Sequence, residues 1–226
     1  MVDGARQKVA VAWSSGKDSA WLLSELMQDE RYEVAALLTT VREGDGSVGI
    51  HGTSRDVLYA QVAAIGLPLY EVSLPWPCPN EDYEQRLRDC AYLLLGNDIT
   101  ALAFGDLQLA DIREYREKLF ADTGLDLLFP LWQRDTGELA QEMIAGGLQA
   151  VVCCVQHDRL PAELLGRRFD AELLSALPED VDHCGESGEF HTIVTSCPAM
   201  SVELELERCE MHADDQHSWL DFSEVE

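Results

Sequence analysis

Short apolar runs alternate with helical segments along most of this chain, and this alternation constrains its fold more than any other feature. Residues 9–13 form an apolar run, and the apolar positions of 18–27 recur at the spacing of one helix face. Further apolar runs, each a predicted strand, follow at 34–38, 69–74, 100–104 and 148–155. Buried strands that alternate with helices predict an α/β fold, namely a three-layer parallel sheet with helices on both faces.

The alternation loosens from about residue 160, which indicates a smaller C-terminal region beside the sheet. We therefore divide the chain into an α/β domain over 1–156, a second region over 157–200 and an acidic strand and tail over 201–226. In the first part, Thr53 or Ser54 is expected to cap a helix that Gly66 ends. The other expected elements are helices at 80–95, 109–122, 135–145, 161–165 and 170–177, and strands at 191–195 and 202–206.

The chain carries a strong negative charge. Its 226 residues include 16 Lys and Arg against 42 Asp and Glu, which gives a formal net charge of −26. Proteins that hold nucleic acid use basic side chains on the phosphates, so we expect no nucleic-acid partner. The segment 201–226 has nine acidic residues and one basic residue, Arg208. This end is expected to be at least partly a solvated tail, and its removal from about residue 213 should leave ligand affinity nearly unchanged.

The cysteines and the apolar runs bear on the compartment. Seven cysteines are present without a C-x-x-C pair, so neither a disulfide framework nor a zinc site is expected. No apolar run reaches the roughly 20 residues of a membrane helix, and no signal peptide is visible at the first residues. We expect a soluble cytoplasmic protein with no membrane partner, and we keep a homodimer open.

The segment between the first predicted strand and the first predicted helix has the composition of a phosphate loop. It reads Ser14-Ser15-Gly16-Lys17-Asp18-Ser19. Hydroxyls, a glycine, a lysine and a helix N-terminus are the parts that hold an anion with several oxygens. A Walker A loop is excluded, because Val11 and Asp18 stand where a glycine and a Ser or Thr are needed. A plain turn with Asp18 as the helix cap remains an alternative.

The same segment resembles the SGGxDS signature of N-type ATP pyrophosphatases, the PP-loop enzymes with the adenine nucleotide alpha-hydrolase-like fold. Ser15 departs from that signature, which has glycine there. Other segments resemble the diphthine–ammonia ligase family, including its bacterial members, over about residues 8–200. They are His51, QVAAIGLPL at 61–69, 80–83, Phe104-Gly105-Asp106, 112–117, Pro130-Leu131-Trp132 and the GESGEFHT motif at 185–192.

The resemblance implies an ATP-dependent, amide-forming ligase. Such an enzyme adenylates a carboxylate and releases pyrophosphate, and ammonia then displaces AMP. The expected partners are ATP, ammonia or ammonium, and an unidentified carboxylate on a small molecule or a modified protein. The expected cofactors are ATP and Mg²⁺, the latter held by Asp18 and Asp106. The residues expected to bind ATP are Ser14, Ser15, Gly16, Lys17, Asp18, Ser19, His51 and Gly105.

The resemblance further implies catalytic roles for Lys17, Asp18, Glu186 and Glu189. Lys17 would stabilise the departing pyrophosphate, and the two glutamates would receive or deprotonate ammonium. Several alternatives stay open: the glutamates could lie in a solvated turn, and Asp106 could be a helix cap. His191 could be a packed residue as well as a base, and His51 a loop residue without a role.

Two other functions compete with the ligase. The first is a PP-loop enzyme of another class, such as one acting on a small metabolite or one that thiolates tRNA. The acidic charge and the missing C-x-x-C count against the tRNA enzyme. The second is a non-catalytic nucleotide-binding protein, against which Lys17, Asp18 and the glutamate motif count. Replacing Lys17 by alanine is expected to stop turnover without disturbing the fold.

Overall fold

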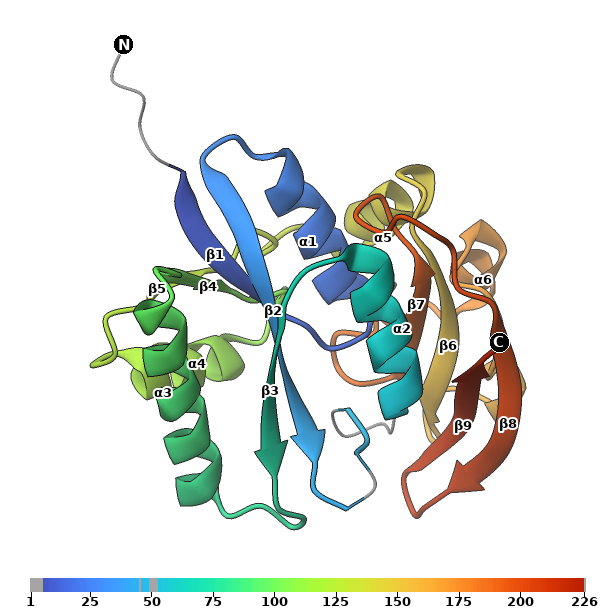
Figure 1. Cartoon of the computed structure of the whole chain (residues 1–226). Helices are drawn as coiled ribbons and strands as arrows, with labels where there is room; N and C mark the ends of the chain where they lie inside the picture. The colour runs from blue at the N-terminus through green and yellow to red at the C-terminus, as the bar shows by residue number, and fades with distance from the viewer. Residues whose placement is uncertain (1–5, 45, 49–52, 226) are drawn as a thin grey trace.

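A parallel sheet of five strands forms the first half of the molecule (Figure 1). The computed structural model describes residues 6–44, 46–48 and 53–225. The strand order is β3-β2-β1-β4-β5, and all of the neighbouring pairs are parallel. The order therefore reverses between β1 and β4, which is where open α/β sheets bind ligands. The strands are β1 (Gln7–Ala12), β2 (Tyr32–Arg42), β3 (Leu69–Leu74), β4 (Ala101–Ala103) and β5 (Asp126–Leu128).

Helices cover both faces of this sheet, as the alternation of apolar runs predicts. Buried residues of α3 (Asn80–Gly96) and α4 (Ala110–Phe120) form a core with one face of the strands. Those of α1 (Lys17–Gln28) and α2 (Arg55–Ile65) form a core with the other face. The expected three-layer α/β arrangement is confirmed (Figure 1).

The ends of the helices follow the capping residues in the sequence. Of the two expected caps of α2, Ser54 is the one used, because its hydroxyl accepts a hydrogen bond from Val57 N at 3.3 Å. Gly66 ends that helix in the left-handed region, with φ of +77°. Asp135 caps α5 (Thr136–Ala145) through a 2.8 Å bond from Glu138 N.

A second, antiparallel sheet holds the C-terminal part of the chain, in the order β7-β6-β9-β8. Its strands are β6 (Gln149–Gln156), β7 (Phe190–Ser196), β8 (Leu206–Ala213) and β9 (His217–Glu224). The apolar run at 148–155 was expected in the parallel sheet, and this expectation is wrong. It forms β6, which pairs antiparallel with β7 and β9, so a division of the chain at residue 156 separates β6 from its own sheet.

The acidic end of the chain is also ordered where an at least partly solvated tail was expected, and its strands are β8 and β9 instead of one strand at 202–206. The hairpin of β8 and β9 joins the second sheet, and β9 is an interior strand that pairs with both β6 and β8. Phe222 of β9 is buried against Cys153 and Cys154 of β6. The charges fit this placement because β8, at the edge of the sheet, keeps most of its side chains exposed.

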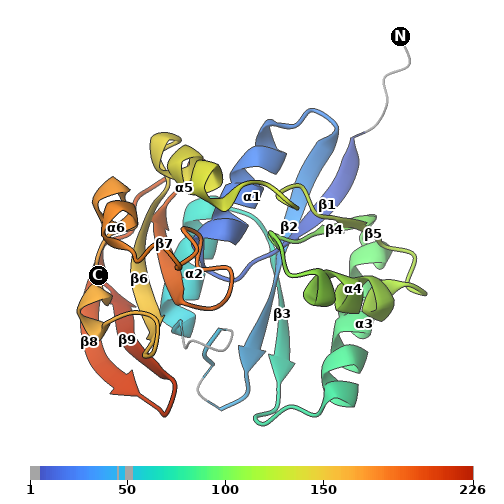
Figure 2. The same ribbon diagram turned by 180° about the vertical axis from the view of Figure 1, so that it is seen from behind.

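The two sheets pack against the same helices. Side chains of α1 and α2 share one core with both β1 and β6, and the ribbon places these helices between the sheets (Figures 1 and 2). Two short elements, a 3₁₀ turn over Ala162–Leu164 and α6 (Ala171–Ala176), follow β6. Among the described residues, none of the helices is long and apolar enough to cross a membrane.

Candidate active site

The predicted phosphate loop lies between β1 and α1, beside the point where the strand order reverses. It borders a cavity of about 310 Å³ at the carboxyl ends of β1 and β4. Polar groups from both halves of the chain converge on this cavity, with an apolar floor beneath them. The polar lining includes Ser14, Asp18, Ser19, Asp106, Arg116 and Glu186, and the apolar lining includes Leu38, Leu87, Leu102, Phe104 and Phe120.

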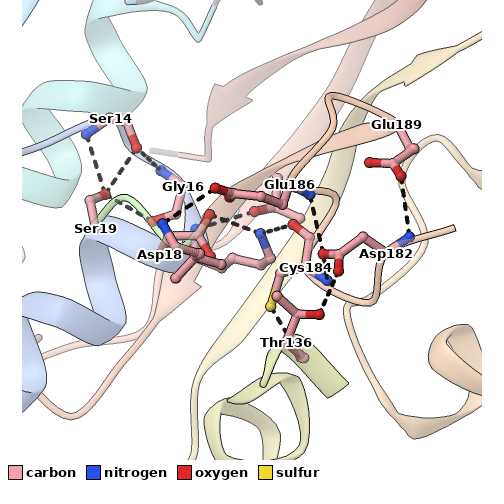
Figure 3. A network of polar contacts seen from close by, with 12 residues as sticks. Ser14, Gly16, Asp18, Ser19, Thr136, Asp182, Cys184, Glu186 and Glu189 are labelled. Atoms are coloured by element: carbon pink, nitrogen blue, oxygen red, sulfur yellow. Dashed lines mark hydrogen bonds and ion pairs between the residues drawn. The ribbon is translucent and has the colours of Figure 1, made fainter. Parts of the chain in front are cut away.

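Two serines of the loop hold each other in place at the cavity wall. Ser19 Oγ accepts a hydrogen bond from Ser14 N at 3.2 Å and donates to Gly16 O at 3.0 Å. The two hydroxyl oxygens lie 3.1 Å apart (Figure 3). Both serines line the cavity, so the loop presents fixed hydroxyls to a ligand. Hydroxyls are one of the features from which the sequence predicted a site for an anion with several oxygens, and the binding of that anion stays a prediction.

Ser15 occupies a backbone conformation that favours glycine. Its φ is +67°, in the left-handed region, and its side chain is fully buried. Within the described residues, its hydroxyl has no hydrogen-bond partner. The substitution of serine for the glycine of the PP-loop signature therefore places a Cβ and a polar atom where the backbone needs neither.

Interactions with the second half of the chain hold the loop. Ser15 O accepts hydrogen bonds from Val194 N of β7 at 2.9 Å and from Gln61 Nε2 at 3.2 Å. The Gln61 amide also donates to Val194 O at 2.8 Å and accepts from Trp13 Nε1 at 3.1 Å. Lys17 N donates to Thr192 Oγ1 at 3.2 Å. This role of Gln61 could not be predicted from the sequence, because its partners are distant along the chain.

The Lys17 side chain is buried and does not line the cavity, although its position in the loop is the predicted one. Its ammonium lies 2.9 Å from Asp18 Oδ2 and donates to Cys184 O. It also lies 5.6 Å from the centre of the Phe190 ring and 5.8 Å from that of Phe169. Burial lowers the pKa of Lys17, but the negative charge of Asp18, with Cys184 and Glu186, outweighs this and leaves that pKa raised. The ammonium is thus a fixed charge inside the protein.

Asp18 faces the cavity with one carboxylate oxygen to spare. Oδ2 binds Lys17, whereas Oδ1 is buried and has no hydrogen-bond partner in the described part of the chain. Gly105, at the end of β4, packs directly against this residue. A Cβ at Gly105 would lie 3.2 Å from the backbone carbonyl of Asp18, so glycine permits this close approach.

Asp106 also lines the cavity, but its carboxylate is already paired with a cationic side chain. Its carboxylate forms an ion pair with Arg116 of α4, with Nε 2.7 Å from Oδ2, and Arg116 Nη2 donates to Oδ1 at 3.2 Å. Arg116 was not predicted from the sequence to have a role of its own, although it lies within the matching segment 112–117. Arg116 contributes a positive charge to the cavity that was expected from Lys17.

Glu186 reaches the cavity from the GESGEFHT segment. Its Oε1 accepts hydrogen bonds from Leu107 N at 3.3 Å, Gln108 N at 2.8 Å and Leu109 N at 3.3 Å, just before α4 begins. Burial raises the pKa of Glu186, and the nearby Asp18 raises it further, against the lowering effect of the backbone N–H groups. A carboxylate with a raised pKa that faces a cavity is suited to accept a proton.

Glu189 lies inside the turn that carries Glu186. It is 2% exposed, and its carboxylate accepts hydrogen bonds from Asp182 N at 3.2 Å and Ser187 N at 2.9 Å. Asp182 in turn accepts from Cys184 N at 2.8 Å and Glu186 N at 3.2 Å (Figure 3). Asp182 and Glu189 thus shape the turn that presents Glu186.

His51 lies outside the described residues. His191 belongs to β7, where it pairs with Cys154 of β6.

The donor set fits Mg²⁺ only together with a phosphate ligand. In the described ranges, no group of three or more His, Cys, Asp or Glu side chains is arranged to hold a metal. The buried, unpartnered Oδ1 of Asp18 is one hard oxygen at the cavity, and nucleotide phosphates would supply others. Asp106 fits less well because both of its oxygens face the Arg116 guanidinium.

Comparisons with known proteins agree with the sequence resemblance. Residues 7–127 match the family described as "Diphthamide synthase N-terminal domain", and residues 135–225 match "Diphthamide synthase C-terminal domain". Three relatives are named diphthine–ammonia ligase. The one from Schizosaccharomyces pombe is 28% identical over 88% of this chain, which spans about a third (36%) of that protein. The one from Bos taurus is 26% identical (90% of this chain, 84% of the relative), and that from Danio rerio 32% (67% and 66%).

Proposed function

Because the chain belongs to the diphthamide synthase family, we propose that it is an ATP-dependent ligase that converts a carboxylate into an amide. In the first step, the carboxylate oxygen attacks the α-phosphorus of ATP, so an acyl-adenylate forms and pyrophosphate leaves. In the second, ammonia attacks the acyl carbon, AMP leaves and a proton is released. One observation carries the proposal: a phosphate loop and Glu186 face one cavity at the reversal of strand order.

The phosphate loop would bind the polyphosphate of ATP. The hydroxyls of Ser14 and Ser19 lie at the wall of the cavity, and each would turn its proton from its present acceptor in the loop toward the leaving pyrophosphate to stabilise its charge. Asp18 Oδ1 would hold Mg²⁺, which supplies positive charge beside the phosphate oxygens. The apolar floor, which includes Leu102 and Phe104, would take the adenosine part.

Glu186 would act on ammonia. Three backbone N–H groups fix one of its oxygens, and its raised pKa suits a carboxylate that takes a proton from ammonium or from the attacking nitrogen. Glu189 would act indirectly, because its buried carboxylate closes the turn that carries Glu186.

Lys17 would position other groups. Its ammonium joins the phosphate loop to the carbonyl of Cys184, and it pairs with Asp18. It would therefore orient Asp18 toward the cavity and hold the 182–189 turn against the loop. This differs from the contact with pyrophosphate that the resemblance implies.

The relatives' name, diphthine–ammonia ligase, contains two substrates, and we propose both of them for this chain. The acceptor would be the carboxylate of diphthine, and ammonia would be the nitrogen donor. Two predictions remain, namely that no nucleic acid binds and that the location is cytoplasmic, and a homodimer is still left open.

The proposed function is tested by following the products of ATP. The purified chain is incubated with ATP, Mg²⁺, ammonium and the diphthine-containing acceptor. AMP and pyrophosphate should form in equal amounts only when both acceptor and ammonium are present. An adenylating enzyme of another class would release both products without ammonium, and a binding protein would leave ATP intact. Either result would contradict the ligase.

A further inference from the structure

The cavity has an uneven balance of charge. Among the described residues that line it, three are acidic, namely Asp18, Asp106 and Glu186, and one is basic, Arg116. Lys17 adds no positive charge at the cavity surface, because its buried ammonium is bound to Asp18 and Cys184 O. A polyphosphate that enters this cavity therefore meets Arg116 as its one positively charged side chain in the described lining.

Arg116 is held in a fixed orientation at the cavity. Its guanidinium carbon lies 4.2 Å from the centre of the Phe104 ring, so the planar group rests on an aromatic face. Asp106 binds the edge of the guanidinium through the ion pair with Nε and Nη2. Arg116 and Asp106 are both partly buried, with side-chain exposures of 27% and 15%.

The ion pair leaves hydrogen-bonding capacity unused. Arg116 Nε lies 2.7 Å from Asp106 Oδ2, yet the two atoms are not aligned for a hydrogen bond. Both are buried, and neither has another partner among the described residues. Because Asp106 Oδ2 covers Nε, the N–H groups that remain for a ligand oxygen are those of the terminal guanidinium nitrogens, where a charge-assisted hydrogen bond can form.

We propose that Arg116 binds phosphate oxygens of ATP, and that Asp106 positions Arg116 instead of holding a metal ion. This inference rests on the proposed function, since it takes ATP as the ligand of the cavity. The guanidinium fork matches a pair of phosphate oxygens, and its charge does not depend on pH in the physiological range. Gly105 connects the pair to the phosphate loop, because it packs on the backbone of Asp18 and precedes Asp106. Arg116 therefore adjoins the polyphosphate site.

The test measures binding of α,β-methylene ATP, which cannot be cleaved to pyrophosphate, by isothermal titration calorimetry. Arg116→Gln should weaken this binding by about 10- to 100-fold, the usual loss for a charged hydrogen bond. Binding of adenosine should change less than about twofold. Arg116→Lys should give an intermediate loss, because it keeps the charge and loses the fork. Lys118→Gln is the matched control on the same helix: Lys118 is exposed and pairs only locally with Glu114, so affinity should not change.

A double variant separates phosphate binding from simple neutralisation of Asp106. Arg116→Gln leaves Asp106 unpaired, and its charge alone would repel ATP. In Asp106→Asn/Arg116→Gln this repulsion is removed, and affinity should stay at least about tenfold below the parent. Recovery of parental affinity in the double variant would overturn the proposal, as would an unchanged affinity in Arg116→Gln. In Asp106→Asn alone, Mg²⁺ should still enhance binding, whereas loss of that enhancement would make Asp106 a metal ligand.

The two proposals fail in different ways. If the parent chain does not bind the ATP analogue at all, the proposed function is wrong. If the parent binds and Arg116→Gln binds equally well, only the role of Arg116 is wrong. If analogue binding is unchanged but the KM for the acceptor rises, Arg116 contacts the acceptor carboxylate, and its assignment to phosphate is overturned.

Discussion

The ammonium of Lys17 donates a hydrogen bond to the backbone carbonyl of Cys184, which lies 167 residues further along the chain. The bond joins the phosphate loop to the turn that presents Glu186, so two halves of the proposed active site share one buried charge. The groups around the Lys17 ammonium separate it from the cavity: Asp18 pairs with it, and the rings of Phe169 and Phe190 lie near it.

Replacing Lys17 should therefore affect stability as well as activity. Lys17→Met removes the charge that pairs with Asp18 and the donor to Cys184 O. Breaking a buried pair typically costs 3–5 kcal/mol, and since Asp18 is 31% exposed we expect about 2–3 kcal/mol less free energy of unfolding. Urea unfolding measures this, with the exposed Lys118→Met as a control that should change it by less than ~0.5 kcal/mol. A variant that is inactive yet as stable as the parent would indicate that Lys17 contacts ATP.

Ser15→Gly should stabilise the chain. It removes a Cβ at φ +67° and a buried hydroxyl without a hydrogen bond, and each costs about 1 kcal/mol or more. We expect a gain of roughly 1–2 kcal/mol in the free energy of unfolding, from urea midpoints at an unchanged slope. Ser15→Ala separates the two causes, because it removes the hydroxyl and keeps the Cβ. The reverse change, Gly188→Ser, should lower the free energy of unfolding, because Gly188 has φ of +86° with open space around it. A loss of stability in Ser15→Gly would show that the backbone at Ser15 is not strained.

Gln61→Leu should destabilise the chain strongly. Gln61 is fully buried, and its amide accepts a hydrogen bond from Trp13 Nε1 and donates to Ser15 O and Val194 O. Leucine leaves the indole N–H without this acceptor and both carbonyls without this donor, at a total cost of about 2–4 kcal/mol. Thermal unfolding measures the effect, and Gln141→Leu, on the exposed side of α5, is the control. Equal melting temperatures for the two variants would show that Gln61 does not hold the loop.

Gly105→Ala should disturb the phosphate loop where Gly105 packs on the backbone of Asp18. The added methyl group would lie 3.2 Å from the Asp18 carbonyl, so the loop must shift, at a cost of about 1–3 kcal/mol. Affinity for α,β-methylene ATP should fall as well. Gly96→Ala is the control, because no atom lies within 4 Å of its Cβ position, and it should leave affinity unchanged. Unchanged affinity in Gly105→Ala would mean that the close approach is not needed for binding.

The pH dependence of activity should report on Glu186. If its carboxylate accepts a proton in the reaction, kcat should rise with pH through the raised pKa of Glu186, which lies above the ordinary value of 4.5. Because the folded state favours the protonated form, this group's contribution to stability is present below pH 4.5 and is lost as the pH rises through the folded pKa. Both dependences should be absent in Glu186→Gln. An identical pH profile of kcat in the variant would exclude Glu186 as the base.

Most of the elements up to β7 could be predicted in order from the sequence, because each change between apolar strand and helical spacing is local, whereas the hairpin of β8 and β9 was not predicted. The phosphate loop was found for the same reason. The sheet to which β6 belongs could not be found this way. Residues such as Val152 pack toward the core shared with α1, and Cys153 packs toward Val57 and Phe222. A strand buried on both faces has the same apolar sequence in an antiparallel sheet as in a parallel one.

The site residues show the same limit. Glu186 was predicted to be a catalytic residue, and it lines the cavity. Glu189 stands only three positions away, yet it faces the interior of the turn. Lys17 and Arg116 show why: a residue type in a motif does not say where its charge points, since that depends on partners such as Cys184 and Asp106 that lie elsewhere in the sequence.

The bonds from β7 and from Cys184 to the phosphate loop also set an order of events during synthesis of the chain. Ser15 and Lys17 leave the ribosome early, but their partners Val194, Thr192 and Cys184 follow some 170 residues later. Until then, the Lys17 ammonium and the Ser15 carbonyl lack these bonds, and closing so long a loop slows folding. A nascent chain that has completed the parallel sheet thus carries the proposed ATP site unfinished, and these bonds form only when the antiparallel sheet docks.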